Sequence, residues 1–302
     1  SLKRWFESKL CRKNQANSFH RHNLARRNPR GASMIDNLRG SALNAPGTLN
    51  APGVSKTLNP SNASERQSAQ PEATSLFSAG EIGGIVGGAC YGNLDAEITS
   101  VVVDSRAVEP GALFVALPGD KADGHDFIEE ALRKGAACII ASLGRVAEIK
   151  GRIEKNLGAE ALKTTCTVFV DEPLRALQLL AKDYRKRMHN LYRIGVTGSS
   201  GKTTTKECIG ATLAPAYPQG ALVMNEGNLN RPEHRIGVFE MGMNRVGEMD
   251  ELDEIYEPDL AVITNIGTAH IGIIGSRQKI AAEKKRIFSR FTGKQIGIVW
   301  ED

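Results

Sequence analysis

The chain has 302 residues, 41% of them hydrophobic, and a formal net charge of +5 at pH 7. This length allows about two domains, and the composition is ordinary for a soluble globular protein. The charge is uneven, because residues 1–75 carry 12 Lys and Arg against 4 Asp and Glu, whereas the rest of the chain carries 27 against 30. The basic excess therefore comes from the N-terminal segment and does not indicate a nucleic-acid-binding domain.

The cysteines also narrow the possible classes. They lie far apart, form no Cys-x-x-Cys motif and have no histidine at zinc-finger spacing; they are Cys11, Cys90, Cys138, Cys166 and Cys208. This pattern favours a reduced compartment. No apolar run approaches the roughly 18 to 20 residues that a membrane span requires, and no secretory apolar segment is present. We therefore expect a cytoplasmic protein that acts on neither nucleic acid nor membranes. A monomer is the expected state, but the sequence leaves the oligomeric state open.

Residues 1–75 are rich in Arg, Asn, Ser, Ala and Pro and contain a near-repeat of Leu-Asn-Ala-Pro-Gly at 43–47 and 49–53. Such a segment has few apolar side chains to offset the entropy of ordering. We expect a disordered basic tail and exclude it from the fold.

Residues 76–172 predict a small α/β domain. The β-branched run 98–103 and the run 113–117 read as strands, a helix near 127–132 ends at Gly135, and a buried strand follows at 137–141. The glycine cluster at 83–88 could suggest a dinucleotide-binding loop, but no strand is expected before it. We expect a structural role for that cluster.

Residues 173–302 predict a second domain. Pro173 opens an amphipathic helix. The strands that follow alternate with helical segments, which indicates a parallel sheet with helices on both faces; they are expected at 191–196, 221–224, 235–240, 260–265 and 296–300. Only 11 residues separate Met224 from Ile236, fewer than most parallel crossovers need. The predicted fold is α/β, with a small N-terminal domain followed by a P-loop domain.

A strand that runs into a glycine turn, a lysine and hydroxyl residues is typical of a phosphate-binding loop. The first usual glycine is replaced by Val196, so the loop is a variant. ATP or GTP is the implied ligand, with Lys202 as the cation for the outer phosphates and Thr203 as a Mg²⁺ ligand. The candidate nucleotide-binding residues are Thr197, Gly198, Ser199, Ser200, Gly201, Lys202, Thr203 and Thr204.

Three further clusters follow the predicted strands, at the sheet edge where open α/β sheets bind ligands. Glu240 ends one strand and could bind Mg²⁺, although a solvated acid at a strand end is as common. Asn265 and His270 follow the next strand, where a single histidine is more often structural. Lys284 lies in a charged stretch that by itself indicates a solvated helix face.

Taken together, these motifs resemble the Mur ligases, the ATP-dependent peptide synthases of the bacterial cell wall. The resemblance covers roughly residues 78–302 and rests on the loop at 197–205 and on Asn265 with His270 five residues later. Gly-Asn-Leu-Asn at 227–230 and Glu-Met-Gly-Met at 240–243 most resemble members that use D-alanyl-D-alanine. The turn Asp104-Ser105-Arg106 resembles part of the family's uridine-nucleotide-binding domain, although this domain fits the diaminopimelate- or lysine-adding members nearly as well.

The resemblance implies a substrate pair and a mechanism. ATP would phosphorylate the terminal carboxylate of UDP-N-acetylmuramoyl-tripeptide, and D-alanyl-D-alanine would attack the acyl phosphate. It implies catalytic roles for Lys202, His270 and a carbamylated Lys284, and Mg²⁺ ligation by Thr203, Glu240, His270 and Lys284. It implies substrate contacts by Asp104, Ser105, Arg106, Asn228 and Asn230. Because like charges lower a lysine pKa, Lys285 and Arg286 are expected to favour the neutral Lys284 amine that reacts with CO₂.

The sequence also departs from the family. Asn230 runs directly into Arg231-Pro232 where a helix is expected, and the family's remaining nucleotide contacts and third domain would lie after Asp302. An alternative is therefore a truncated or degenerate protein that binds nucleotide or UDP-sugar without catalysis. A P-loop switch NTPase fits less well, because it explains neither the first domain nor Asn265 and His270.

Overall fold

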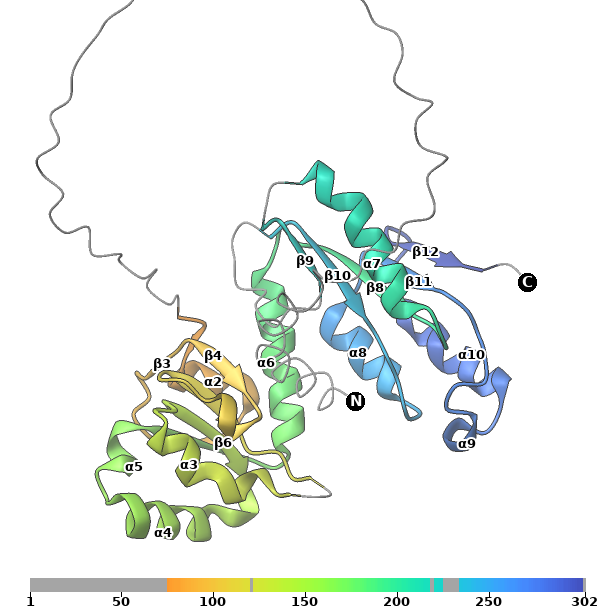
Figure 1. The fold of residues 1–302 in the computed structure, drawn as a ribbon. Coiled ribbons are helices and arrows are strands. Elements are labelled where there is room, and N and C mark those ends of the chain that lie inside the picture. Colours follow the sequence, from red (N-terminus) through yellow and green to blue (C-terminus); the bar gives the residue numbers. More distant parts are fainter. Residues whose placement is uncertain (1–74, 120–121, 218–219, 225–233, 301–302) are drawn as a thin grey trace, which may run out of the picture. The chain divides into compact units, whose positions relative to one another are not determined.

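The computed structural model describes residues 75–119, 122–217, 220–224 and 234–300 (Figure 1). The predicted tail at 1–75, except Ser75, and the predicted substrate residues Asn228 and Asn230 lie outside these ranges. The described residues form two five-stranded sheets and a two-stranded sheet.

The first five-stranded sheet has the order β2-β7-β6-β5-β4. Its strands are parallel except for the edge strand β2, which runs antiparallel to β7. The bounds are β2 Ala89–Gly92, β4 Ser100–Val102, β5 Ala112–Val115, β6 Cys138–Ser142 and β7 Cys166–Val170. The predicted strand 98–103 is divided, because β3 (Glu97–Ile98) pairs with β1 (Phe77–Ser78) whereas β4 pairs with β5.

Helices cover both faces of this sheet. Residues along a strand alternate between the two faces, so neighbouring residues of one strand pack in different cores. Leu113 and Val115 of β5 belong to a core that includes Ile82 of α2, whereas Phe114 belongs to a second core with Ile149 of α4. The helices of this region are α2 Ala79–Val86, α3 Ile128–Arg133, α4 Val146–Leu157 and α5 Ala161–Thr164, with 3₁₀ turns η2 Ser105–Ala107, η3 Gly124–Phe127 and η4 Leu143–Arg145.

The glycine cluster at 83–88 is part of α2 and its end. Gly87 adopts a left-handed conformation (φ 66°) and caps the helix. This supports the structural role expected from the sequence.

Helix α6 (Pro173–Arg187) begins at the predicted proline. Its apolar residues Ala176, Leu177 and Leu180 pack in the core that contains Leu113 of the first sheet. The helix therefore completes that core before the chain enters the second sheet.

The second five-stranded sheet is fully parallel and has the order β12-β11-β8-β10-β9. Its strands are β8 Tyr192–Thr197, β9 Leu222–Met224, β10 Ile236–Glu240, β11 Leu260–Ile263 and β12 Ile296–Val299. The predicted strands and α/β class are thus confirmed. The short connection does not prevent β9 from lying parallel to β10, although residues 225–233 of it lie outside the described ranges.

Helices pack on both faces of this sheet as well. Ile209 of α7 packs with Ile194 and Val238, whereas Met249 of α8 and Ile280 of α10 pack with the residues around Ala261. The bounds are α7 Lys202–Leu213, α8 Glu248–Tyr256, α9 Ile271–Ile274 and α10 Arg277–Lys285, with η5 Ala214–Ala216 and η6 Arg286–Phe288. Within the described ranges, no helix has the length and apolar character needed to cross a membrane.

The strand order determines where the candidate site lies. β8 is the central strand, paired with β10 on one side and β11 on the other. The loops that follow these three strands therefore leave the same edge of the sheet, side by side.

Candidate active site

The loop between β8 and α7 depends on two glycines with unusual backbone conformations. Gly198 has φ 152°, and a Cβ placed there would overlap with the hydroxyl of Thr264. Gly201 has φ 76° and is the N-cap of α7. No atom lies near a Cβ placed on Gly201, so the left-handed backbone is what favours glycine there.

The N-terminus of α7 presents unpaired amide groups. The first bond within the helix runs from the Thr205 N–H to the Gly201 carbonyl (2.9 Å). The N–H groups of residues 201–204 are therefore the four that an α-helix cannot satisfy internally. Gly201, Thr203 and Thr204 are exposed. With the positive end of the helix dipole, this end of α7 is suited to bind an anion.

Two other amide groups of the predicted loop have protein partners. The N–H groups of Ser199 and Ser200 donate to the main-chain oxygen and the Oδ1 of Asn265, at 3.1 and 3.0 Å. Thr197 is completely buried. The N–H groups of Ser199 and Ser200 are therefore already paired, whereas those of residues 201–204 have no partner within α7.

Lys202 lies across the loop. Its Nζ donates a hydrogen bond to the Gly198 carbonyl at 3.0 Å. The ammonium group is thus held at the loop that precedes α7, where an anion bound at the helix N-terminus would meet it.

Glu240, at the end of β10, faces a lysine that the sequence analysis did not single out. Lys206 of α7 is 8% exposed, and its Nζ lies 3.8 Å from Glu240 Oε1 and 2.9 Å from Glu207 Oε1. Residues three apart on a helix share a face. Thr203 is therefore on the Glu240 side of α7, one turn before Lys206; the Lys-Thr-Thr-Thr-Lys spacing could have indicated this.

Lys284 of α10 is only 2% exposed. Burial, and then the charge of Lys202, lower the pKa of Lys284 to about 8. The predicted cause was wrong: Lys285 is exposed, and the Arg286 guanidinium pairs with Asp250 at 2.6 Å. The charge that lowers the pKa of Lys284 is that of Lys202. Because Lys202 is distant in sequence, the pattern around Lys284 could not identify it.

Two buried acids hold the loop after β10 in place. Glu248 Oε2 accepts a hydrogen bond from the Asn244 N–H, and Glu283 Oε1 accepts one from the Gly247 N–H, both at 2.6 Å. Because Glu283 precedes Lys284 in α10, this bond ties the loop that follows Glu240 to the helix that carries Lys284. Nothing in the sequence pattern marked these acids.

His270 is exposed and has a left-handed backbone (φ 67°) at the N-cap of α9. Within the described parts of the chain, no group of three or more His, Cys, Asp or Glu residues is arranged to hold a metal ion.

The predicted substrate turn in the first sheet region is internally bonded. Arg106 forms a two-pronged pair with Asp104, with distances of 3.0 Å to Oδ1 and 2.6 Å to Oδ2, which lowers the pKa of Asp104. Ser105 is buried, and its hydroxyl donates to Glu130 Oε2 at 3.1 Å. The Arg106 side chain nevertheless remains 80% exposed.

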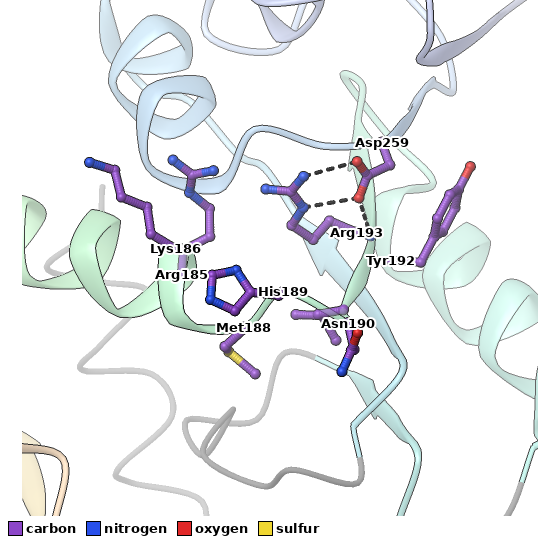
Figure 2. Close-up of a pocket in the computed structure, with 9 residues that line it drawn as sticks. Arg185, Lys186, Met188, His189, Asn190, Tyr192, Arg193 and Asp259 are labelled. Carbon is purple, nitrogen blue, oxygen red and sulfur yellow. Dashed lines mark hydrogen bonds and ion pairs between the residues drawn. The ribbon is translucent and has the colours of Figure 1, made fainter.

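A cavity of about 520 Å³ lies elsewhere, where α6 leads into β8 (Figure 2). Its basic residues include Arg185, Lys186 and Arg193, but Arg193 forms a two-pronged pair with Asp259 at 2.9 Å. The cavity is at the amino end of β8, opposite the loop at Gly198. It is therefore separate from the candidate active site.

The sequences of both five-stranded-sheet regions match known protein families. The profile of the Mur ligase family catalytic domain matches residues 97–185, and that of the Mur ligase middle domain matches residues 196–302. The chain belongs to the Mur ligase family.

Individual Mur ligases agree with this assignment. The UDP-N-acetylmuramoyl-tripeptide–D-alanyl-D-alanine ligase of Treponema pallidum is 44% identical over 220 residues, which are 67% of this chain and 45% of that protein. A crystal structure of MurF from Acinetobacter baumannii has a TM-score of 0.62 at 31% identity and covers 74% of this chain and 48% of that one.

The MurF ligase from Thermotoga maritima in complex with ADP has a TM-score of 0.54 at 32% identity, and covers 67% of this chain and 46% of that one. The chain thus spans about half the length of the Mur ligases it matches.

Lys284 gives a prediction on stability. Its folded pKa of about 8 lies below the ordinary value of 10.5, so the unfolded chain binds more protons between these pH values and stability should rise with pH across that window. In CO₂-free buffer, Lys284→Met should remove this rise and increase the free energy of unfolding at pH 7 by up to about 3 kcal/mol.

Urea unfolding at several pH values measures this effect. Lys285→Met is the matched control, because it removes an exposed charge from the neighbouring position and should leave the pH dependence unchanged. If the free energy of unfolding depends on pH equally in the wild type and in Lys284→Met, Lys284 is not a buried lysine with a lowered pKa.

Proposed function

We propose that this chain supplies the nucleotide-binding part of an ATP-dependent ligase that joins D-alanyl-D-alanine to UDP-N-acetylmuramoyl-tripeptide. The observation that carries the proposal is the open N-terminus of α7, with Lys202 beside it and Glu240 and Lys284 on neighbouring elements. The name of the Treponema relative supports these substrates, and the ADP complex of the Thermotoga relative supports nucleotide binding.

The residues at the edge of the second sheet suit phosphoryl transfer. The N–H groups of residues 201–204 would hold phosphate oxygens, and the Lys202 ammonium would exchange the Gly198 carbonyl for the transferring phosphate. The tripeptide carboxylate would attack that phosphorus with loss of ADP. The amine of the dipeptide would then attack the acyl carbon with loss of phosphate and a proton. Positioning and charge neutralisation are the protein's main contributions.

The same residues fit Mg²⁺. This ion prefers oxygen ligands and is usually held by one or two carboxylates together with substrate phosphates. Glu240 and the Thr203 hydroxyl, on facing elements, offer such a set. When bound, Mg²⁺ would neutralise phosphate charge. Lys206 would hold the Glu240 carboxylate in place, because its ammonium lies 3.8 Å away.

We further propose that Lys284 is carbamylated and, with His270, serves a second Mg²⁺. A pKa of about 8 leaves about one in ten Lys284 amines neutral at pH 7, against about one in 3,000 for an ordinary lysine. The neutral amine is the form that reacts with CO₂. A carbamate ¹³C resonance in ¹³C-bicarbonate buffer, lost in Lys284→Met and kept in Lys285→Met, would support this modification.

The UDP part of the substrate is proposed to bind at Asp104, Ser105 and Arg106. The exposed Arg106 guanidinium suits a pyrophosphate. In the structure it pairs with Asp104, so binding would require an exchange of partners, and Ser105 would act by holding the turn through Glu130.

Nucleotide binding is tested at Lys202. Lys202→Ala should weaken ATP binding by about 1.5 to 3 kcal/mol, roughly 10- to 150-fold, because it removes a charged hydrogen bond to phosphate. Calorimetry measures the affinity. Lys186→Ala, in the separate basic cavity, is the matched control and should bind ATP normally; equal affinity in the Lys202 variant would exclude the proposed site.

Ligation itself is tested by mass spectrometry with ATP, Mg²⁺, UDP-N-acetylmuramoyl-tripeptide and D-alanyl-D-alanine. Because the chain spans about half of its relatives, we expect little pentapeptide from this chain and robust product when it is extended with the remainder of the Treponema relative. ATP binding without product from the extended protein would instead favour a non-catalytic nucleotide-binding protein.

A further inference from the structure

The loop after β11 forms a dense set of hydrogen bonds with the loop after β8. The Thr264 hydroxyl donates to the Ser200 carbonyl at 2.6 Å, and Asn265 Nδ2 donates to Ser200 Oγ at 2.8 Å and to the Ser200 carbonyl at 3.3 Å. In return, the Ser200 N–H donates to Asn265 Oδ1 at 3.0 Å. The Gly267 N–H donates to Ser199 Oγ at 2.8 Å.

The loops after β8 and β11 also pack closely against each other. A Cβ on Gly198 would overlap with Thr264, and a Cβ on Gly267 would lie 3.2 Å from the Cβ of Ser199. The glycine at 198, which a phosphate loop explains by backbone flexibility alone, is therefore also needed for contact with Thr264.

These contacts set the direction of the peptide groups around Ser200. Two donors, from Thr264 and Asn265, hold the Ser200 carbonyl on the side of the β11 loop. A carbonyl oxygen turned toward a bound phosphate would repel it. With the Ser199 and Ser200 amides also paired, the unpaired amides are left at the N-terminus of α7.

We propose that Thr264 and Asn265 are positioning residues that hold the phosphate loop in its binding conformation before nucleotide arrives. This inference rests on the proposed function, since it assigns the loop a phosphate ligand. It gives Asn265 a role distinct from that of a metal or substrate ligand: its side chain contacts Ser200 and acts on the nucleotide only through that residue.

The same segment reaches the rest of the site. The Ile266 carbonyl accepts a hydrogen bond from Arg277 Nε at 2.9 Å, and Arg277 begins α10, the helix that carries Lys284. His270 follows five residues after Asn265. The β11 loop therefore connects the phosphate loop with both groups proposed for the second Mg²⁺.

A competing interpretation makes the opposite prediction. Asn265 Oδ1 could occupy the Ser200 amide as a substitute for a phosphate oxygen, so that nucleotide must displace it. Removing the side chain would then strengthen nucleotide binding, whereas removing a positioning residue weakens it.

The experiment uses Asn265→Ala and Thr264→Val, with Thr264→Ser as the conservative variant that keeps the hydroxyl. Thr268→Val, an exposed position in the same segment, is the matched control. Amide hydrogen exchange in the nucleotide-free protein is followed by NMR, and ADP and ATP affinities are measured by calorimetry. Thermal unfolding verifies that each variant is folded.

We expect the Ser200 amide to exchange at least about tenfold faster in Asn265→Ala, and ADP and ATP to bind about tenfold more weakly in Asn265→Ala and Thr264→Val. Thr264→Ser and Thr268→Val should resemble wild type. Unchanged exchange at Ser200, or tighter nucleotide binding by Asn265→Ala, would overturn the positioning role.

The two proposals fail in different ways. If the wild-type chain binds neither ADP nor ATP, the proposed function fails, and exchange at Ser200 in the free protein still decides whether Asn265 orders the loop. If the wild type binds nucleotide and Asn265→Ala binds it equally well, only the positioning role fails. If Asn265→Ala does not fold, the nucleotide affinities of Thr264→Val and Thr264→Ser are compared instead. Thr264→Val loses the hydroxyl that bonds the Ser200 carbonyl and Thr264→Ser keeps it, so weaker binding by Thr264→Val alone supports the positioning role and equal binding contradicts it.

Discussion

The candidate site depends on a constraint at one edge of the second sheet: the buried ammonium group of Lys284 lies close enough to the Lys202 ammonium to be repelled by it. Lys284 is almost fully buried, its pKa is lowered by burial and by Lys202, and within the described parts of the chain neither lysine has an acidic partner. A charged ammonium group that is buried close to a second cation is unfavourable unless an anion joins them or one of them is neutralised. A phosphate on Lys202 and a carbamate on Lys284 would each relieve this cost.

The parallel sheet is what brings these groups together. Because β8 lies between β10 and β11, the loop after β8 is flanked by Glu240 on one side and by Thr264 and Asn265 on the other. The buried acids Glu248 and Glu283 then fix the loop after β10 and link it to α10. The site is thus held by bonds between loops, with each loop anchored on a buried strand.

Much of this architecture could be predicted from the sequence, because it depends on local patterns. Apolar runs identified the strands of the second sheet, Pro173 marked the start of α6, and Gly198 and Gly201 marked the turn between β8 and α7. The divided strand at Thr99 was missed, since its two halves take different partners that a run of β-branched residues does not reveal.

The contacts that tune the site could not be predicted in this way. Lys206 approaches Glu240, and Lys202 lowers the pKa of Lys284, across sequence separations that no local pattern spans. Asn265 was noticed only as part of a motif, and its bonds to Ser200 depend on the pairing of β8 with β11. The pairing of Arg106 with Asp104 was likewise not predicted from the sequence.

The most direct test of the account is the pKa of Lys284 itself, measured by NMR on ¹³Cε-labelled lysine in CO₂-free buffer with and without ADP. The account predicts a value near 8 in the free protein and a clear increase when ADP is bound, because a phosphate beside Lys202 adds negative charge near Lys284. A value near 10.5 that does not respond to ADP would contradict both the burial of this lysine and the placement of phosphate at the N-terminus of α7.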